Sequence, residues 1–298
     1  GGARRDRMGT VVDRLSSLDT SFLYMEDRAT VMHVGAVMVF APPEGRLDHD
    51  RLLTLIGQRV ATLPRYRQRI AQVPGHLARP VWVDDEHFDL SYHVRRAALP
   101  RPGTDAQLEE FVARIQSRPL DRNRPLWEVY VVEGLEQGRF AIVTKTHHAL
   151  IDGITALDIG HVLIGADPGW EKPAPDLWRP RPAPSDVSLV ASAIVDSVKG
   201  PRAMIEAVRG GTSEVAQLGG RVASSVGELV AAVVKGAARP APTSPLNSPV
   251  GQSRRFVMVG TDLSAYREVR ARLARGPHAD DVSINDIVLA SIAGALRS

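Results

Sequence analysis

The sequence of 298 residues contains no cysteine. This absence excludes thiol nucleophiles, cysteine-ligated zinc and iron–sulfur sites, and disulfide scaffolds. Long apolar runs are absent as well, since none approaches the roughly 18 residues that a membrane-spanning helix needs. We therefore expect a protein of the reducing cytoplasm without an integral membrane segment.

An excess of one charge is also absent, because 37 Lys and Arg face 34 Asp and Glu, a net charge of +3. Nucleic-acid-binding domains usually carry a concentrated basic patch, so we expect no nucleic-acid partner. The hydrophobic share of 44% and the charged share of 24% are typical of globular proteins. At about 150 residues per domain, the length predicts roughly two domains.

Several common catalytic motifs are missing. The chain has no GxSxG, GxGxxG or GxxxxGK[ST] sequence. It therefore lacks the motifs that are typical of serine hydrolases, Rossmann enzymes and P-loop enzymes. It also has no HExxH and no carboxylate cluster beside its histidine pair, so we expect no metal site and no bound cofactor. Among the reaction classes considered, this leaves a histidine-based transfer reaction without a covalent intermediate.

The patterning that is present alternates strand and helix signals. The run MHVGAVMVF over 32–40 predicts a buried strand, and Asp48 is placed to cap a helix that Pro64 ends. Thr104 and Gln107 have the spacing of a capping box at the start of a second helix. The segments 127–132 and 140–146, separated by a glycine-containing turn, predict a hairpin. We also expect helices at 155–163 and from Ser283, and a strand over 255–260.

Composition shifts suggest three regions. Residues 9–184 hold the strand and helix signals described above, and we expect them to form an N-terminal domain. Residues 185–249 read as a helical and proline-rich linker, ending in RPAPTSPLNSP. Residues 250–298 would begin a C-terminal domain, although about fifty residues are too few to complete one.

The segment HHALIDG is the most informative one in the chain. It places His147, His148, Asp152 and Gly153 directly after the predicted strand, where scaffolds often present catalytic groups. Neighbouring side chains on a strand point to opposite faces, so only one of the two imidazoles can face a cleft. A neutral histidine there is a competent general base near pH 7. A buried histidine pair without chemistry is the alternative interpretation.

At these residues a family resemblance becomes clear. HHALIDG is similar to the HHxxxDG motif of the CoA-dependent acyltransferase superfamily, and the chain resembles the bacterial wax ester synthase/diacylglycerol acyltransferase family. The segments that carry this resemblance are LSSLDTSFLYMED, MHVGAVMVF, PLDRNRPLWEVYVVEGL, KTHHALIDG, SPLNSPVGQSRRF and SINDIVLASIAGALR. The resemblance implies an α/β fold in which helices flank a chloramphenicol-acetyltransferase-like mixed sheet. It also implies a two-domain architecture whose second domain is incomplete in this chain.

The resemblance also implies a reaction and a set of roles. His148, the second histidine of the motif, would be the base for acyl transfer from acyl-CoA to diacylglycerol or a fatty alcohol. His147 and Asp152 would organise the loop, with Asp152 paired to an arginine, and Gly153 would give the backbone room. A condensation-like acyltransferase with a carrier-protein donor, or a catalytically silent lipid-binding protein, are the alternatives.

Two further segments and one surface complete the expected site. Pro125, Leu126 and Trp127 would brace the sheet or line a tunnel, and Asn285 and Asp286 either cap the last helix or belong to the site. Because the substrates are neutral lipids, we expect peripheral association with membranes or lipid droplets. The valine stripe over 215–238 could make that contact or pack on its own protein.

Overall fold

A computed structural model of the chain describes residues 13–41, 47–151, 178–194, 250–273 and 282–297. The chain divides into two compact units, Gly1–Arg255 and Phe256–Ser298. Each unit is described below by itself. The proposed division at residues 184 and 249 stays a prediction.

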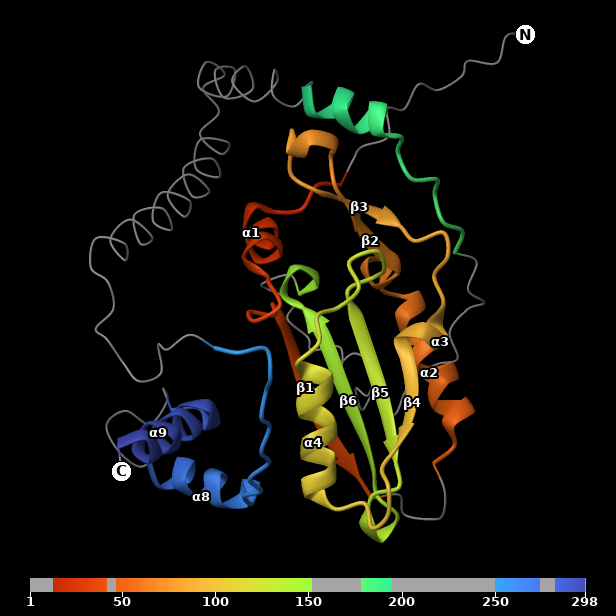
Figure 1. Cartoon of the computed structure of the whole chain (residues 1–298). Coiled ribbons are helices and arrows are strands. Elements are labelled where there is room, and N and C mark those ends of the chain that lie inside the picture. Colours follow the sequence, from red (N-terminus) through yellow and green to blue (C-terminus); the bar gives the residue numbers. More distant parts are fainter. Residues whose placement is uncertain (1–12, 42–46, 152–177, 195–249, 274–281, 298) are drawn as a thin grey trace. The chain divides into compact units, whose positions relative to one another are not determined.

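A four-stranded mixed sheet forms the centre of the first unit (Figure 1). Its order is β1 (His33–Phe40), β6 (Phe140–His147), β5 (Trp127–Glu133) and β4 (Val94–Ala98). Antiparallel pairing joins β1 to β6 and β5 to β6, whereas β4 runs parallel to β5. The predicted hairpin is confirmed, and a strand forms within 32–40. The expected burial of that strand is wrong, because β1 is an edge strand and none of its residues is fully buried.

One face of the sheet is covered by helix α4 (Asp105–Gln116). The predicted capping box is present: Thr104 Oγ1 accepts from the Gln107 backbone N–H, and the Gln107 side chain accepts from the Thr104 N–H. The apolar side of the helix, Leu108, Val112 and Ile115, is buried, and Phe111 contacts the ring of Tyr130 on β5. The helix therefore packs its apolar side against this face of the sheet.

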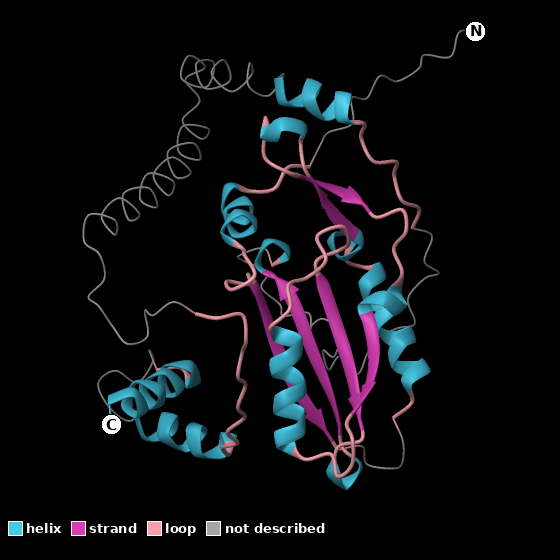
Figure 2. Ribbon diagram, viewed as in Figure 1, coloured by secondary structure: helices cyan, strands magenta, loops and turns pink. Residues whose placement is uncertain are grey.

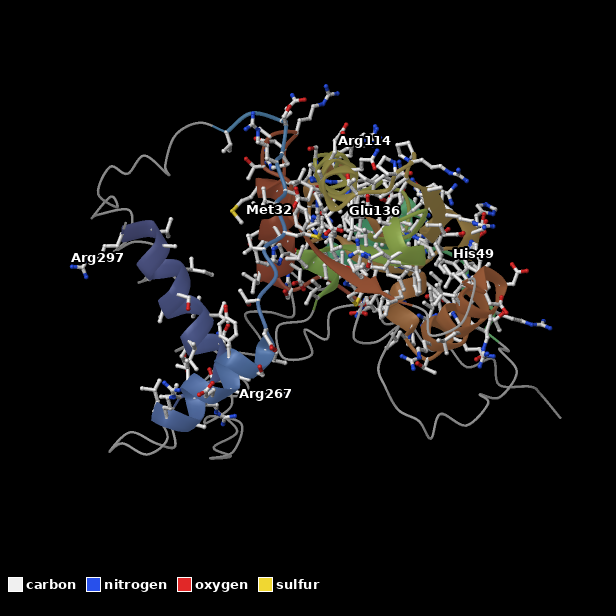
Figure 3. The ribbon with its side chains drawn as sticks, turned by 90° about the horizontal axis from the view of Figure 1, so that it is seen from below. Met32, His49, Arg114, Glu136, Arg267 and Arg297 are labelled. Atoms are coloured by element: carbon white, nitrogen blue, oxygen red, sulfur yellow. The ribbon has the colours of Figure 1, made fainter. Side chains whose placement is uncertain are left out.

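The opposite face packs against α2 (His49–Ala61), and α1 (Ser17–Met25) adds Leu23 to the same core. Asp48 caps α2 as predicted, because its carboxylate accepts from the Arg51 N–H at 2.9 Å. Figure 3, seen along the strands, shows His49 of α2 and Arg114 of α4 on opposite sides of the sheet. Helices therefore flank a mixed sheet on both faces, which confirms the predicted fold class. The core on the α1 and α2 side includes Leu23, Ile56, Val60, Trp127, Val129, Val131 and Ile142.

Smaller elements extend this unit (Figure 2). Strands β2 (Gln68–Ala71) and β3 (Val81–Asp84) form a separate two-stranded sheet, and α3 (Leu90–His93) leads directly into β4. The short 3-10 turns are η1 (Pro64–Arg67), η2 (Pro74–His76), η3 (Glu136–Gly138) and η4 (His148–Leu150). A helix over 186–194 packs Leu189 and Ala193 onto the small sheet.

The second unit contains α8 (Leu263–Leu273) and α9 (Ile284–Arg297). Ser283 caps α9 as predicted, since its hydroxyl accepts from the Asp286 N–H at 3.2 Å. The predicted strand over 255–260 is wrong, because these residues are irregular. A strand needs a neighbour to pair its backbone groups, and the described residues provide none for this segment.

Several predictions lie outside the described residues. They concern the helix at 155–163, the loop residues Asp152 and Gly153, and the valine stripe within 215–238. Among the helices that the structure does describe, none has the length and apolar character needed to cross a bilayer.

Candidate active site

The histidine pair lies where β6 ends and η4 begins. His147 is the last residue of β6 and is completely buried, whereas His148 opens η4 and is partly exposed. The predicted asymmetry of the two imidazoles is therefore present. It arises because β6 is paired on both sides up to its end, which fixes the direction of the His147 side chain.

His147 makes two contacts through its two ring nitrogens. Its Nδ1 accepts a hydrogen bond from the Ala149 backbone N–H at 2.9 Å, which closes the first residues of η4. Its Nε2 lies 3.6 Å from Glu26 Oε2, slightly beyond a direct hydrogen bond. The ring is thus held between a backbone amide and a carboxylate.

Glu26 is a site residue that the sequence analysis did not identify. Its side chain is 3% exposed and accepts from Arg122 Nη2 at 2.8 Å and from the Met32 backbone N–H at 3.2 Å. Burial favours the protonated form of this carboxyl. The contacts from His147, Arg122 and Met32 outweigh that effect and lower the pKa of Glu26 to about 2. A buried carboxylate therefore lies beside the first histidine.

His148 has a different environment. Its ring stacks on Phe22 of α1, with the centroids 5.0 Å apart, and its backbone N–H donates to Met32 O at 2.9 Å. Partial burial, and secondarily the neighbouring His147, lower the pKa of His148 below the ordinary histidine value of 6.5. The imidazole is therefore predominantly neutral at pH 7, as a general base must be.

On the α4 side of the sheet, Lys145 of β6 is buried and His33 of β1 is partly buried. Lys145 Nζ donates to Ile115 O at 3.2 Å and to Arg118 O, and the His33 ring contacts Gln116 O at 3.2 Å. Burial lowers the pKa of Lys145 to about 8 and that of His33 to about 4. These contacts satisfy carbonyls at the C-terminal end of α4 and fix the helix to β6.

The segment Pro125–Trp127 adjoins the end of β6. The His147 backbone N–H donates to Leu126 O at 3.0 Å, and Leu126 and Trp127 are both completely buried. The Trp127 indole donates to Tyr66 O at 2.8 Å and stacks on His93, with the centroids 4.5 Å apart. This segment therefore packs under the histidine-bearing turn.

The other predicted site residues are Asp152, Gly153, Asn285 and Asp286. Asp152 and Gly153 lie outside the described residues, so an arginine partner for Asp152 is not tested. Asp286 acts in the α9 cap, where its Oδ2 accepts from the Ser283 N–H at 2.7 Å, and Asn285 is exposed beside it. The capping alternative for Asp286 is therefore present in the structure.

Arg122 also lines a cavity of about 510 Å³. Leu23, Arg69 and Leu189 contribute to its walls together with Arg122. Arg122 thus joins the cavity to Glu26 and, through it, to His147. No group of three or more potential metal ligands occurs within the part of the chain described by the structure.

The chain can now be compared with known proteins. Residues 15–288 match the wax ester synthase/diacylglycerol acyltransferase catalytic domain. A Mycobacterium tuberculosis protein named "Probable diacyglycerol O-acyltransferase tgs3" is 45% identical over 265 residues, with 88% of this chain and 97% of the relative covered. A second protein from that organism, tgs2, is 35% identical over 96% of this chain but only 60% of its own length.

A solved structure of a wax ester synthase/diacylglycerol acyltransferase is also similar to this chain. The wax ester synthase/diacylglycerol acyltransferase from Marinobacter aquaeolei matches 95% of this chain and 60% of its own, with a TM-score of 0.57 and 29% identity. The present chain therefore spans less than two thirds of that protein's length. The fold, the histidine site and these relatives define the class of the protein as an O-acyltransferase. The chain belongs to the wax ester synthase/diacylglycerol acyltransferase family.

Proposed function

We propose that this protein transfers an acyl group from acyl-CoA to the hydroxyl of diacylglycerol or of a fatty alcohol. The products would be triacylglycerol or wax ester together with free CoA, and no further cofactor would be needed. The names of the relatives support these substrate classes. The observation that carries the assignment of the base is the difference between the two histidines.

His147 has no lone pair free for a substrate. Its Nδ1 is occupied by the Ala149 N–H, its Nε2 faces Glu26, and the whole residue is buried. His148 is partly exposed, and its lowered pKa leaves the ring able to accept a proton at pH 7. This contrast favours His148 as the general base.

In the proposed reaction, His148 takes the proton of the acceptor hydroxyl while the hydroxyl oxygen attacks the thioester carbonyl carbon. The carbon–sulfur bond then breaks, the CoA thiolate leaves, and His148 passes the proton that it took from the hydroxyl to that sulfur. An ester and free CoA result, without an acyl-enzyme. His147 and Asp152 would organise the loop, and Gly153 would give its backbone room. The segment Pro125–Trp127 would brace the sheet beneath this loop.

The test compares two alanine variants with labelled palmitoyl-CoA, hexadecanol and diacylglycerol. A general base contributes about 10²- to 10⁴-fold, so His148→Ala should lose that factor in kcat. His147→Ala should lose less, through disorder of the turn. A folded His147→Ala protein with the larger loss would refute the assignment. Transfer only from an acylated carrier protein would favour the condensation-like alternative, and no turnover of either donor by the parent would favour the silent lipid-binding one.

We also propose peripheral association with a membrane or lipid-droplet surface, because the proposed acceptors and products partition into lipid. Scattered basic residues and the net charge of +3 support a salt-sensitive component. Co-sedimentation with anionic vesicles at low and high salt tests this proposal, and equal recovery in the supernatant with and without vesicles would contradict it.

A further inference from the structure

The Glu26 carboxylate next to the histidine pair is not only buried but also held in one orientation. Glu26 follows the last residue of α1 and accepts hydrogen bonds through both carboxylate oxygens, Oε1 from the Met32 N–H and Oε2 from Arg122. Arg122 is itself fixed, because its Nη2 also donates to Leu23 O at 2.8 Å. The carboxylate is therefore held in one orientation, with Oε2 toward His147.

The hydrogen bond from Ala149 assigns the protons of the His147 ring. Because the Ala149 N–H points at Nδ1, that nitrogen must offer its lone pair and carries no proton. The proton of the neutral ring is consequently on Nε2, the atom that lies 3.6 Å from Glu26 Oε2. A doubly protonated ring would instead set two N–H groups against each other at Nδ1. The carboxylate thus lies where it can select one tautomer.

Met32 connects the same carboxylate to the second histidine. The Met32 N–H donates to Glu26 Oε1, and the Met32 carbonyl accepts from the His148 N–H at 2.9 Å. Glu26 therefore contacts the turn from two sides, through the His147 ring and through the peptide that binds the His148 backbone. The route through the His147 ring is shielded from water, since the Glu26 side chain is 3% exposed and His147 is completely buried.

We infer that Glu26, oriented by Arg122, is a positioning residue that fixes His147 as the Nε2–H tautomer and thereby holds the turn that presents His148. The role rests on the proposed function, in which His148 is the base. A purely structural ion pair would lower stability when broken without changing the tautomer of His147. That difference makes the two roles distinguishable.

The experiment uses the full chain with ¹⁵N-labelled histidine. Long-range ¹H–¹⁵N spectra of the parent should show His147 protonated at Nε2 and unprotonated at Nδ1. Glu26→Gln keeps the size of the side chain but removes the charge that holds the Nε2–H side of the ring. The Nε2–H signal should therefore weaken, and a population in which the Ala149 hydrogen bond is broken and Nδ1 is protonated should appear. Partners that orient metal-bound histidines are worth about 10- to 100-fold, and we expect a fall in kcat of about that size with KM for acyl-CoA changed less than about twofold.

Glu133→Gln is the matched control, since it breaks an exposed ion pair with Arg96 at the other end of β5. It should leave the His147 spectrum and kcat unchanged. A parent protein with His147 protonated at Nδ1 would overturn the inference, whether or not the variant folds. A folded Glu26→Gln protein with the parent spectrum and kcat would also overturn it. If the parent shows no acyl transfer, the proposed function fails, while the tautomer measurement still decides the role of Glu26.

Discussion

Gly35 offers a sharp test of how α4 is fixed to the sheet. It lies in β1 opposite Lys145 of β6, and a Cβ atom added there would lie 2.0 Å from Gln116 Nε2 and 2.7 Å from Thr144 O. The Gln116 side chain can rotate away only by losing its 3.2 Å hydrogen bond to Thr144 O. The Thr144 carbonyl belongs to β6 and cannot move without separating the paired strands.

Gly35→Ala should therefore lower the free energy of unfolding by about 1–3 kcal/mol, the usual cost of adding a methyl group where there is no room for it. Urea denaturation followed by far-UV circular dichroism measures this change, and the melting temperature should fall by roughly 2–4 °C for each kcal/mol. Because β6 ends at His147, we also expect a lower kcat.

Gly57→Ala is the matched control in α2. Its added Cβ would meet only the end of the flexible Leu90 side chain, at 2.9 Å, and alanine favours a helix over glycine by about 1 kcal/mol. This variant should be neutral or slightly more stable. If Gly35→Ala were as stable as the parent, α4 would not occupy the close position described here.

Two pH dependences follow from the site. Since partial burial and His147 lower the pKa of His148, kcat/KM should rise with pH through a midpoint below 6.5, and a midpoint at or above that value in a pH–rate profile would contradict the role of His148. The pKa of Glu26 falls from 4.5 to about 2 on folding, so its contribution to stability is complete above pH 4.5 and is lost as the pH falls toward 2. At about 1.4 kcal/mol per tenfold change in proton affinity, this contribution is roughly 3 kcal/mol. Acid titrations of the parent and Glu26→Gln should differ by that loss, and parallel curves would refute it.

The sequence by itself determined the features that depend on neighbouring residues. The caps at Asp48, Thr104 and Ser283 are hydrogen bonds across three positions, and the β5–β6 hairpin depends on one short turn, so local patterns predicted them. The motif segment placed two histidines after a strand, and strand alternation predicted that they would face different surroundings.

Only the tertiary structure decided how distant segments meet. Glu26 and Arg122 contact each other, and Glu26 contacts His147, because α1 and the segment before β5 converge at the end of β6, a pairing that no local spacing encodes. The parallel placement of β4 beside β5 was likewise not predicted, and the expected strand over 255–260 did not form. In each case the outcome depends on whether a distant segment supplies a hydrogen-bond or ion-pair partner. Local propensity contains no information about that partner.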